Sequence, residues 1–414
     1  MESETRAPEI RFEGFTDPWE QRKLGDVATS FDYGLNAAAT EYDGQNKYLR
    51  ITDIDDETHR FLKSDLTTPL ADLEKSACYL LKEGDLLFAR TGASVGKTYL
   101  YRQFDGIVFF AGFLIRARIG EDVDPEFVYQ ATLTDAYRKY VVIASQRSGQ
   151  PGVNAQEYAN YRIMLPSKTE QHQIGMALRS IDSLITLHQR KYDKLCVVKK
   201  SMLDKMFPKP GALYPEIRFE GFTDPWEQCK LGDFSKKATT KNTDGALNET
   251  FTNSAERGVV SQLDYFDHDI TNEASVNGYY VVRPNDFVYN PRISATAPCG
   301  PINRNRLNRA GVMSPLYTVF SIDDGVCKTY LEHYFKTSRW HDFMFLEGNS
   351  GARSDRFSIS DSLFFEMPIW CPSLAEQEAI AQQLELADSL ITLHQCKLEL
   401  LKNVKKSLLE KMFV

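Results

Sequence analysis

The sequence predicts a mixed α/β (α+β) fold built as a tandem repeat, in which two globular regions are joined by two long helices that form a coiled coil. Two internal repeats support this prediction. A helix-like stretch from Ser183 to Phe207 returns as Ser389 to Phe413. A second segment, Pro8 to Asp26, returns as Pro215 to Asp233 with Cys229 in place of Arg22 as the only change. The chain is therefore expected to be two half-molecules in tandem.

Both copies of the helix-like stretch have the apolar spacing of a coiled-coil seam, with positions that alternate mostly between three and four residues apart. Two such stripes in one chain most simply bury each other. About 36 residues, at about 1.5 Å of rise each, give a helix on the order of 55 Å long. The seam includes Ile181, Ile185, His188, Leu195 and Val198 in the first copy, and Ala387, Ile391, His394, Leu401 and Val404 in the second.

His188 and His394 occupy matching seam positions. They are either a pH-sensitive or register-setting pair or simply polar residues tolerated in an antiparallel coil. The remaining histidines have no metal-ligand spacing, and the sequence contains no HExxH motif and no paired cysteines. We therefore expect no metal site.

The composition is that of a soluble globular protein. At 414 residues the length predicts two to three domains, and 42% hydrophobic with 26% charged residues is ordinary. No apolar run approaches the roughly 18 residues of a membrane span, and the first residues lack a signal-peptide pattern. The seven scattered cysteines favour reduced thiols and a cytoplasmic location. The net charge of -8 argues only mildly against nucleic-acid binding, because a basic face can coexist with an acidic remainder.

The two globular regions show strand patterns with one helix pattern each, which is typical of α+β or α/β domains. In the first, a helix is expected from about Asp124 to Ala144, and in the second from about Val326 to Phe345. The expected strands are residues 47–54, 85–91, 98–102, 106–119 and 161–166 in the first region, and 279–283, 286–292, 311–322 and 364–370 in the second.

These patterns divide the chain into six segments. They are an N-terminal arm (1–26), a first globular domain (27–167), a first spacer helix (168–207), a linker with the repeated arm (208–233), a second globular domain (234–373) and a second spacer helix (374–414). Identity is concentrated in the arms and helices, whereas the globular domains differ. Near-identical arms and helices suit binding two copies of one partner, and divergent domains suit reading two different targets.

Four motifs together resemble the specificity subunit of type I restriction-modification enzymes, over essentially the whole chain. They are the EIRFEGFTDPWEQRKLGD opening, the GDLLFARTGASVGK stretch, a serine-glycine loop before a proline-ended strand, and an EQxxI start to each long helix. Each motif alone is weak. In this order and repeated, they are specific.

The resemblance implies a non-catalytic, pseudo-twofold chain in which two target-recognition domains are joined by two long helices that form an antiparallel coiled-coil spacer. Such a subunit directs two modification (adenine methyltransferase) subunits, and in the larger complex two restriction subunits, to a bipartite asymmetric site in double-stranded DNA. S-adenosylmethionine, ATP and magnesium are then expected on the partner subunits, with no cofactor on this chain. Antiparallel helices would present each domain to the opposite strand, and their length would set the gap between half-sites. The N-terminal arm is expected to pack beside the C-terminus.

Polar and basic residues in two loops of the first domain and three segments of the second are candidate DNA contacts, because arginine, lysine and amide side chains bind phosphates and base edges. The alternative is a tight turn with solvated charges. In the first domain the candidates are Arg90, Thr91, Ser94, Lys97, Gln146, Arg147, Ser148 and Gln150. In the second they are Arg292, Ser294, Thr296, Arg304, Arg306, Arg309, Asn349, Ser350, Arg353 and Arg356.

Two other functions fit the sequence less well. TGASVGKT, residues 91–98, is close to a phosphate-binding P-loop, but Thr91 replaces its first glycine and the residues after Lys97 are expected to be extended rather than helical. Asn290-Pro291-Arg292 lacks the aromatic residue of a methyltransferase motif. A structural adaptor that binds only proteins is the remaining alternative, and a salt-dependent DNA gel shift would separate it from a DNA-reading subunit.

Overall fold

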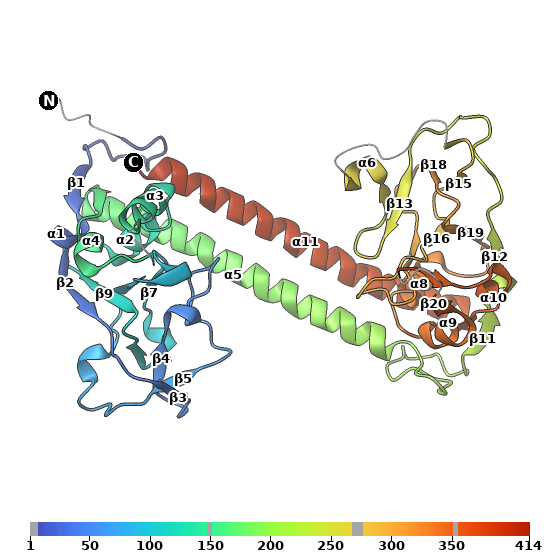
Figure 1. The fold of residues 1–414 in the computed structure, drawn as a ribbon, viewed down its shortest axis with the longest axis horizontal. Coiled ribbons are helices and arrows are strands. Elements are labelled where there is room, and N and C mark those ends of the chain that lie inside the picture. Colours follow the sequence, from blue (N-terminus) through green and yellow to red (C-terminus); the bar gives the residue numbers. More distant parts are fainter. Residues whose placement is uncertain (1–6, 147–150, 267–275, 351–354) are drawn as a thin grey trace. The chain divides into compact units, whose positions relative to one another are not determined.

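The computed structural model describes residues 7–146, 151–266, 276–350 and 355–414. It divides into two compact units, residues 1–189 with 395–414 (unit 1) and residues 190–394 (unit 2). Two long helices, α5 (Lys168–Lys205) and α11 (Leu374–Met412), each contribute one segment to either unit (Figure 1). The predicted tandem architecture of two mixed α and β domains connected by two long helices is confirmed.

A four-stranded antiparallel sheet in the order β2-β9-β6-β7 forms the centre of unit 1. Leu86 and Phe88 of its inner strand β6 pack on one face, while Leu87 and Ala89 pack on the other, as alternation along a strand requires. The strands are β1 (Glu20–Lys23), β2 (Ala28–Tyr33), β3 (Ala39–Glu41), β4 (Lys47–Leu49), β5 (Thr67–Pro69), β6 (Asp85–Ala89), β7 (Thr98–Leu100), β8 (Val108–Phe110), β9 (Leu114–Ile119) and β10 (Arg162–Leu165). The short helices are α1 (Leu24–Val27), α2 (Pro125–Ala131), α3 (Asp135–Ala144) and α4 (Ala155–Ala159).

Unit 2 repeats this plan with a sheet in the order β12-β19-β16-β17. The pair β11–β22 stands where unit 1 has β1–β10. The strands are β11 (Glu227–Lys230), β12 (Ser235–Lys237), β13 (Phe251–Ser254), β14 (Gly258–Ser261), β15 (Tyr280–Val282), β16 (Phe287–Tyr289), β17 (Ile302–Arg304), β18 (Gly311–Met313), β19 (Thr318–Ile322), β20 (Asn349–Ser350), β21 (Phe357–Ser358) and β22 (Pro368–Cys371). The short helices are α6 (Gln262–Tyr265), α8 (Lys328–Tyr334), α9 (His341–Glu347) and α10 (Asp361–Phe365).

Several predicted elements are broken in two. The helix expected over residues 124–144 is wrong as a single element, because Thr134 ends α2 by donating its hydroxyl to the Ala131 carbonyl and then accepts from Tyr137 N to cap α3. The helix expected over residues 326–345 is likewise divided into α8 and α9. The strands expected over residues 106–119 and 311–322 are each two strands joined by a turn. Phe364 and Phe365 end α10 rather than starting β22.

The two long helices pair antiparallel within each unit. In unit 1 the Lys405 ammonium lies 2.6 Å from Asp182 Oδ1, and in unit 2 the repeated residues Lys199 and Asp388 make the same ion pair. The predicted seam residues Ile181, Ile185, His188, Leu195, Ile391, His394 and Leu401 are half-buried, and Ala387 is buried. Val198 and Val404 were placed on the seam wrongly, since they are 42% and 40% exposed.

Each arm fastens to the start of one long helix. Arg11 donates from Nε and Nη2 to the two oxygens of the buried Glu170, at 2.7 and 2.8 Å, and Arg218 repeats this fork on Glu376 in unit 2. The Ile10 amide donates to the Lys411 carbonyl at 3.0 Å. The predicted packing of the N-terminal arm beside the C-terminus is therefore confirmed.

Candidate nucleic-acid interface

In unit 1 the loop after β6 lies beside residues 151–153, which directly follow the second loop predicted to contact DNA. The loop after β6 begins at Arg90, and Thr91 forms an antiparallel bridge with Gly152. Gly92 N donates to the Pro151 carbonyl at 3.1 Å, and Val153 N donates to the Arg90 carbonyl at 2.9 Å. Residues 90–94 thus lie beside the segment that follows the second loop. Gln146 is exposed after α3, whereas Arg147, Ser148 and Gln150 lie outside the described residues.

Arg90 is held between two aromatic rings. Its guanidinium carbon lies 5.0 Å from the centre of the Tyr33 ring and 5.9 Å from that of Phe113. Both rings are open to solvent, at 44% and 56% exposure, and no carboxylate pairs with Arg90 within the described parts of the chain. This combination can contact a phosphate or a guanine edge. Sequence reasoning missed Tyr33 and Phe113, because they reach Arg90 only through the pairing of β9 with both β2 and β6.

Lys97, at the other end of the same loop, points inward. Its side chain is only 10% exposed, and its ammonium lies 2.8 Å from the Ile54 carbonyl and 2.5 Å from Asp56 Oδ1. Gly96 has φ of +84°, and a Cβ there would meet Val141 at 2.5 Å. The glycine therefore permits packing against α3. The half-buried Arg90, Thr91 and Ser94 are left as the loop's candidates for DNA contact.

Unit 2 contains the matching junction at the end of β16. Arg292 bridges Arg356 in antiparallel fashion, Ile293 N donates to the Asp355 carbonyl at 3.0 Å, and Phe357 N donates to the Pro291 carbonyl at 2.8 Å. Like charges directly opposite each other are unfavourable in a ladder. Among the described residues no carboxylate pairs with either guanidinium. The junction is therefore suited to an anion such as a DNA phosphate.

Polar residues surround this arginine pair in sequence. Ser294 and Thr296 are exposed, and their hydroxyl oxygens lie 3.3 Å apart. Asn349 is exposed and, with Ser350, forms β20, which pairs with β21 directly after Arg356. Arg353 lies outside the described residues. The structure thus brings Arg292, Ser294, Thr296, Asn349, Ser350 and Arg356 into one region through backbone pairing.

Three other predicted residues, Arg304, Arg306 and Arg309, form ion pairs with carboxylates of unit 2. Arg304 and Arg306 pair with Glu332 at 2.9 and 2.8 Å, and Arg306 also pairs with Glu385 of α11. Arg309 forms a two-pronged pair with Glu249 at 2.7 Å for both contacts, which raises the pKa of Arg309. Since their charges are neutralised within the fold, we assign these arginines to packing, and Arg292 and Arg356 become the stronger candidates.

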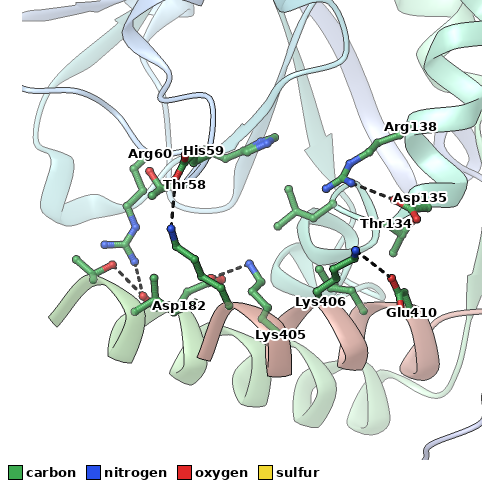
Figure 2. Close-up of a pocket in the computed structure, with 16 residues that line it drawn as sticks. Thr58, His59, Arg60, Thr134, Asp135, Arg138, Asp182, Lys405, Lys406 and Glu410 are labelled. Carbon is green, nitrogen blue, oxygen red and sulfur yellow. Dashed lines mark hydrogen bonds and ion pairs between the residues drawn. The ribbon is translucent and has the colours of Figure 1, made fainter. Parts of the chain in front are cut away.

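Asp182 of α5 anchors the first domain to the helix pair. Its Oδ2 accepts from Gln130 Nε2 of α2 at 3.0 Å. Its carbonyl accepts from Arg60 at 3.0 Å, and its Oδ1 pairs with Lys405 (Figure 2). These contacts border a cavity of 390 Å³ that is also lined by His59. Burial lowers the pKa of His59, which keeps its ring neutral beside the lysines. The polar anchor therefore fixes the domain on the helices that carry it.

Comparisons with known proteins all point to similarity with one family. Residues 16–196 match the model described as type I restriction modification DNA specificity domain. A putative type I restriction enzyme MjaX specificity subunit from Methanocaldococcus jannaschii is 24% identical over 415 residues, covering 95% of this chain and 92% of the relative. Residues 16–196 therefore match this family's domain, and the chain as a whole is similar to type I restriction-modification specificity subunits.

Two further proteins are similar to this chain. The type I restriction enzyme MjaVIII specificity subunit of the same archaeon is 24% identical over 155 residues, covering 37% of this chain and 35% of the relative. The crystal structure of a type I restriction-modification S subunit from M. genitalium covers 99% of both chains with a TM-score of 0.63 and 12% sequence identity. At that identity the likeness shows the shared fold.

The described residues also bear on membrane spans, metal sites and nucleotide binding. No helix among them is long and apolar enough to cross a membrane. Within the same residues, no group of three or more histidine, cysteine or acidic side chains is placed to hold a metal ion. Residues 92–94 form a 3-10 turn and residues 98–100 a strand, which confirms that the P-loop-like motif is followed by extended chain.

Proposed function

We propose that this chain, as a specificity subunit, reads a bipartite asymmetric site in double-stranded DNA, with one half-site for each globular domain. The observation that carries the proposal is the repeated junction at the end of the inner strands β6 and β16, where Arg90 in one domain and the Arg292–Arg356 pair in the other lack acidic partners among the described residues. The loops differ in sequence between the domains, so the two half-sites would differ.

The long helices would set the gap between the half-sites. Their 38 and 39 residues, at about 1.5 Å each, give helices on the order of 57 Å. The repeated lysine–aspartate pairs fix one register, because each ties one long helix to the other in its own unit. A rigid spacer of this kind would keep the number of unread base pairs constant.

The chemistry would reside on partner subunits. We propose that the chain is cytoplasmic and non-catalytic. It would direct adenine methylation by two modification subunits and cleavage by restriction subunits. S-adenosylmethionine, ATP and magnesium would be bound by those partners. The near-identical arms and helices support two copies of one partner, because they offer the same surface twice. A protein-only adaptor is less favoured, since it would have no need, at the matching junctions of both domains, for arginines that lack acidic partners among the described residues.

Single-molecule methylome sequencing tests the proposal. A host that expresses this chain with its methyltransferase partner would be compared with a host that expresses the partner alone. We expect a new motif of two short specified parts with a fixed gap and with adenine methylated on both strands. No new motif in cells where the complex demonstrably assembles would contradict DNA reading and favour the adaptor function.

A further inference from the structure

One position breaks the repeat between the two arms. Cys229 stands where the first arm has Arg22, and this is the only difference between residues 8–26 and 215–233. Arg22 lies in β1, where its Nη2 donates to the Asp26 carbonyl at 2.9 Å. Cys229 lies in β11 and is half-buried against the core of unit 2. The second arm therefore has a thiol where the first arm has a guanidinium.

The strand that pairs with β11 contains a second cysteine that unit 1 lacks. Glu227 pairs with Cys371 of β22, whereas the repeated residue Glu20 pairs with Leu165 of β10. Cys371 therefore stands where unit 1 has Leu165. The chain has only seven cysteines among 414 residues, so two on one pair of short strands are uncommon by chance.

The two cysteines are diagonal neighbours on one face of the β11–β22 pair. Cys229 pairs with Ile369, and Cys371 follows two residues later on the same strand as Ile369. Because side chains alternate along a strand, Ile369 and Cys371 lie on the same face as Cys229. Both cysteines pack against the same hydrophobic core. Burial raises the pKa of Cys371, and the neighbouring Cys229 thiol raises that pKa further.

We propose that Cys229 and Cys371 form a reversible disulfide when a peroxide reaches unit 2. The Cys229 sulfur attacks one peroxide oxygen, the O–O bond breaks, and the products are a sulfenic acid and one water. The Cys371 sulfur then attacks the Cys229 sulfur, so that the S–S bond forms and the S–O bond breaks. The departing hydroxide takes the Cys371 proton and leaves as a second water. Two thiols are thereby oxidised, and one hydrogen peroxide is reduced to two waters.

The order of these steps follows from the two environments. The thiolate is the form that attacks an oxidant, and the raised pKa keeps Cys371 protonated at neutral pH. Cys229 is therefore the residue that meets the peroxide, and Cys371 is the neighbour that completes the disulfide. An accessible cysteine beside a second one is the arrangement typical of redox-sensitive thiols.

The strand register also explains why the bond would be reversible. Diagonal neighbours have Cα atoms about 7–8 Å apart, whereas a disulfide usually joins Cα atoms about 4.4–6.8 Å apart. The strands must approach slightly, which the two-stranded pair β11–β22 can do without displacing a third strand. A bond formed with such strain is more easily reduced.

The disulfide would fasten the second arm to its own domain. That arm also carries Arg218, which binds Glu376 at the start of α11. Unit 1 has Arg22 and Leu165 at the corresponding places and cannot make this bond, so oxidation would act on unit 2 alone. The proposed modification lies beyond DNA reading and does not depend on it.

The first test is peptide mass spectrometry of the full chain after brief treatment with hydrogen peroxide. We expect a peptide containing Cys229 to be linked to one containing Cys371, and dithiothreitol should remove the link. The exposed thiols of Cys78 and Cys396 report general oxidation. Absence of the linked peptide once these two exposed thiols are oxidised would overturn the proposal.

The variants for this test come from unit 1 itself. Cys229→Arg and Cys371→Leu each restore the residue that unit 1 has at the same place, so each should fold, and thermal unfolding with reductant present checks this. Both variants should lose the linked peptide. A peptide of the same mass in either variant would show that the link joins other cysteines, which would contradict the proposal.

The second test is hydrogen exchange of the two strands. Peroxide should slow exchange of the β11 and β22 amides at least about tenfold, because the strands cannot separate while the bond is intact. The amides of β1 and β10 are the matched control and should not change, nor should β11 and β22 in Cys229→Arg. Unchanged exchange in chains that mass spectrometry shows to be linked, or equal slowing in Cys229→Arg, would exclude the fastening role.

Discussion

The sharpest prediction separates arginines that the fold leaves free from those it neutralises. Arg292 and Arg356 lie opposite each other without a carboxylate partner among the described residues, whereas Arg309 is held by both oxygens of Glu249. We therefore expect Arg292→Ala and Arg356→Ala to weaken DNA binding, and Arg309→Ala to leave it nearly unchanged.

The magnitude follows from counterion release. Each neutralised phosphate contributes about 0.9 to the slope of log K against log salt. Losing one phosphate contact should reduce the magnitude of this slope by about 0.9. If the variant and the unmodified chain bind equally at about 1 M salt, the variant should then bind DNA about eightfold more weakly at about 0.1 M salt. The double variant should lose about 1.8 in slope if each arginine meets its own phosphate.

The assay is fluorescence anisotropy of a labelled duplex with the assembled methyltransferase complex over a salt series. Arg309→Ala is the matched control, because it removes the same charge from the same domain. Glu249 should then be left unpaired without any loss of DNA affinity. An unchanged slope in the Arg292→Ala, Arg356→Ala double variant, or an equal change in Arg309→Ala, would refute the assignment.

Three further predictions concern the scaffold. Glu170→Gln should destabilise the first arm by about 3 kcal/mol, because it leaves Arg11 without its buried carboxylate partner. Hydrogen exchange of residues 8–26 should then be faster than in the exposed control Glu13→Gln. Equal exchange rates in the two variants would contradict this prediction. Burial lowers the pKa of His333 to about 3, so the folded state disfavours the charged ring. The free energy of unfolding should therefore be fully present above about pH 6.5 and should decrease toward pH 3 by up to about 1.4 kcal/mol per pH unit. His333→Gln, which copies Gln130 of unit 1, should reduce that dependence in pH-dependent denaturation, and an identical pH profile would exclude it. Deleting one heptad from each long helix should shorten the gap by about 10 Å, or about three base pairs, and methylome mapping with an unchanged gap would refute the spacer role.

Much of the architecture was predictable because the relevant signals are local or repeated. The seam periodicity predicted both long helices, and the duplicated arm predicted the two-unit plan. Helix breaks were not predicted, because the sequence at Thr132–Thr134 has no proline or glycine and the break depends on hydroxyl groups that bond back to α2. Residues 106–119 and 311–322 were each predicted as one strand, because a continuous apolar run gives no sign of the turn that divides it into two strands.

The candidate site was only partly predictable. The candidate segments were proposed from their composition, and their contact with DNA stays a prediction. The structure adds bridges between residues about 61 and 64 positions apart in sequence, Thr91 with Gly152 and Arg292 with Arg356. The aromatic rings around Arg90 were missed, because Tyr33 comes from a different strand. Composition also could not distinguish an arginine facing solvent from one facing a carboxylate.

The sequence by itself determined the repeat, the long helices and the resemblance to a specificity subunit, because periodicity and duplicated motifs are properties of the chain. Only the tertiary structure decided which charges are available to a ligand. Glu332 lies 26 residues from Arg306, and Glu249 lies 60 residues from Arg309. Such pairs form when strands and helices pack, and whether an arginine can meet DNA depends on whether folding has already given it a carboxylate.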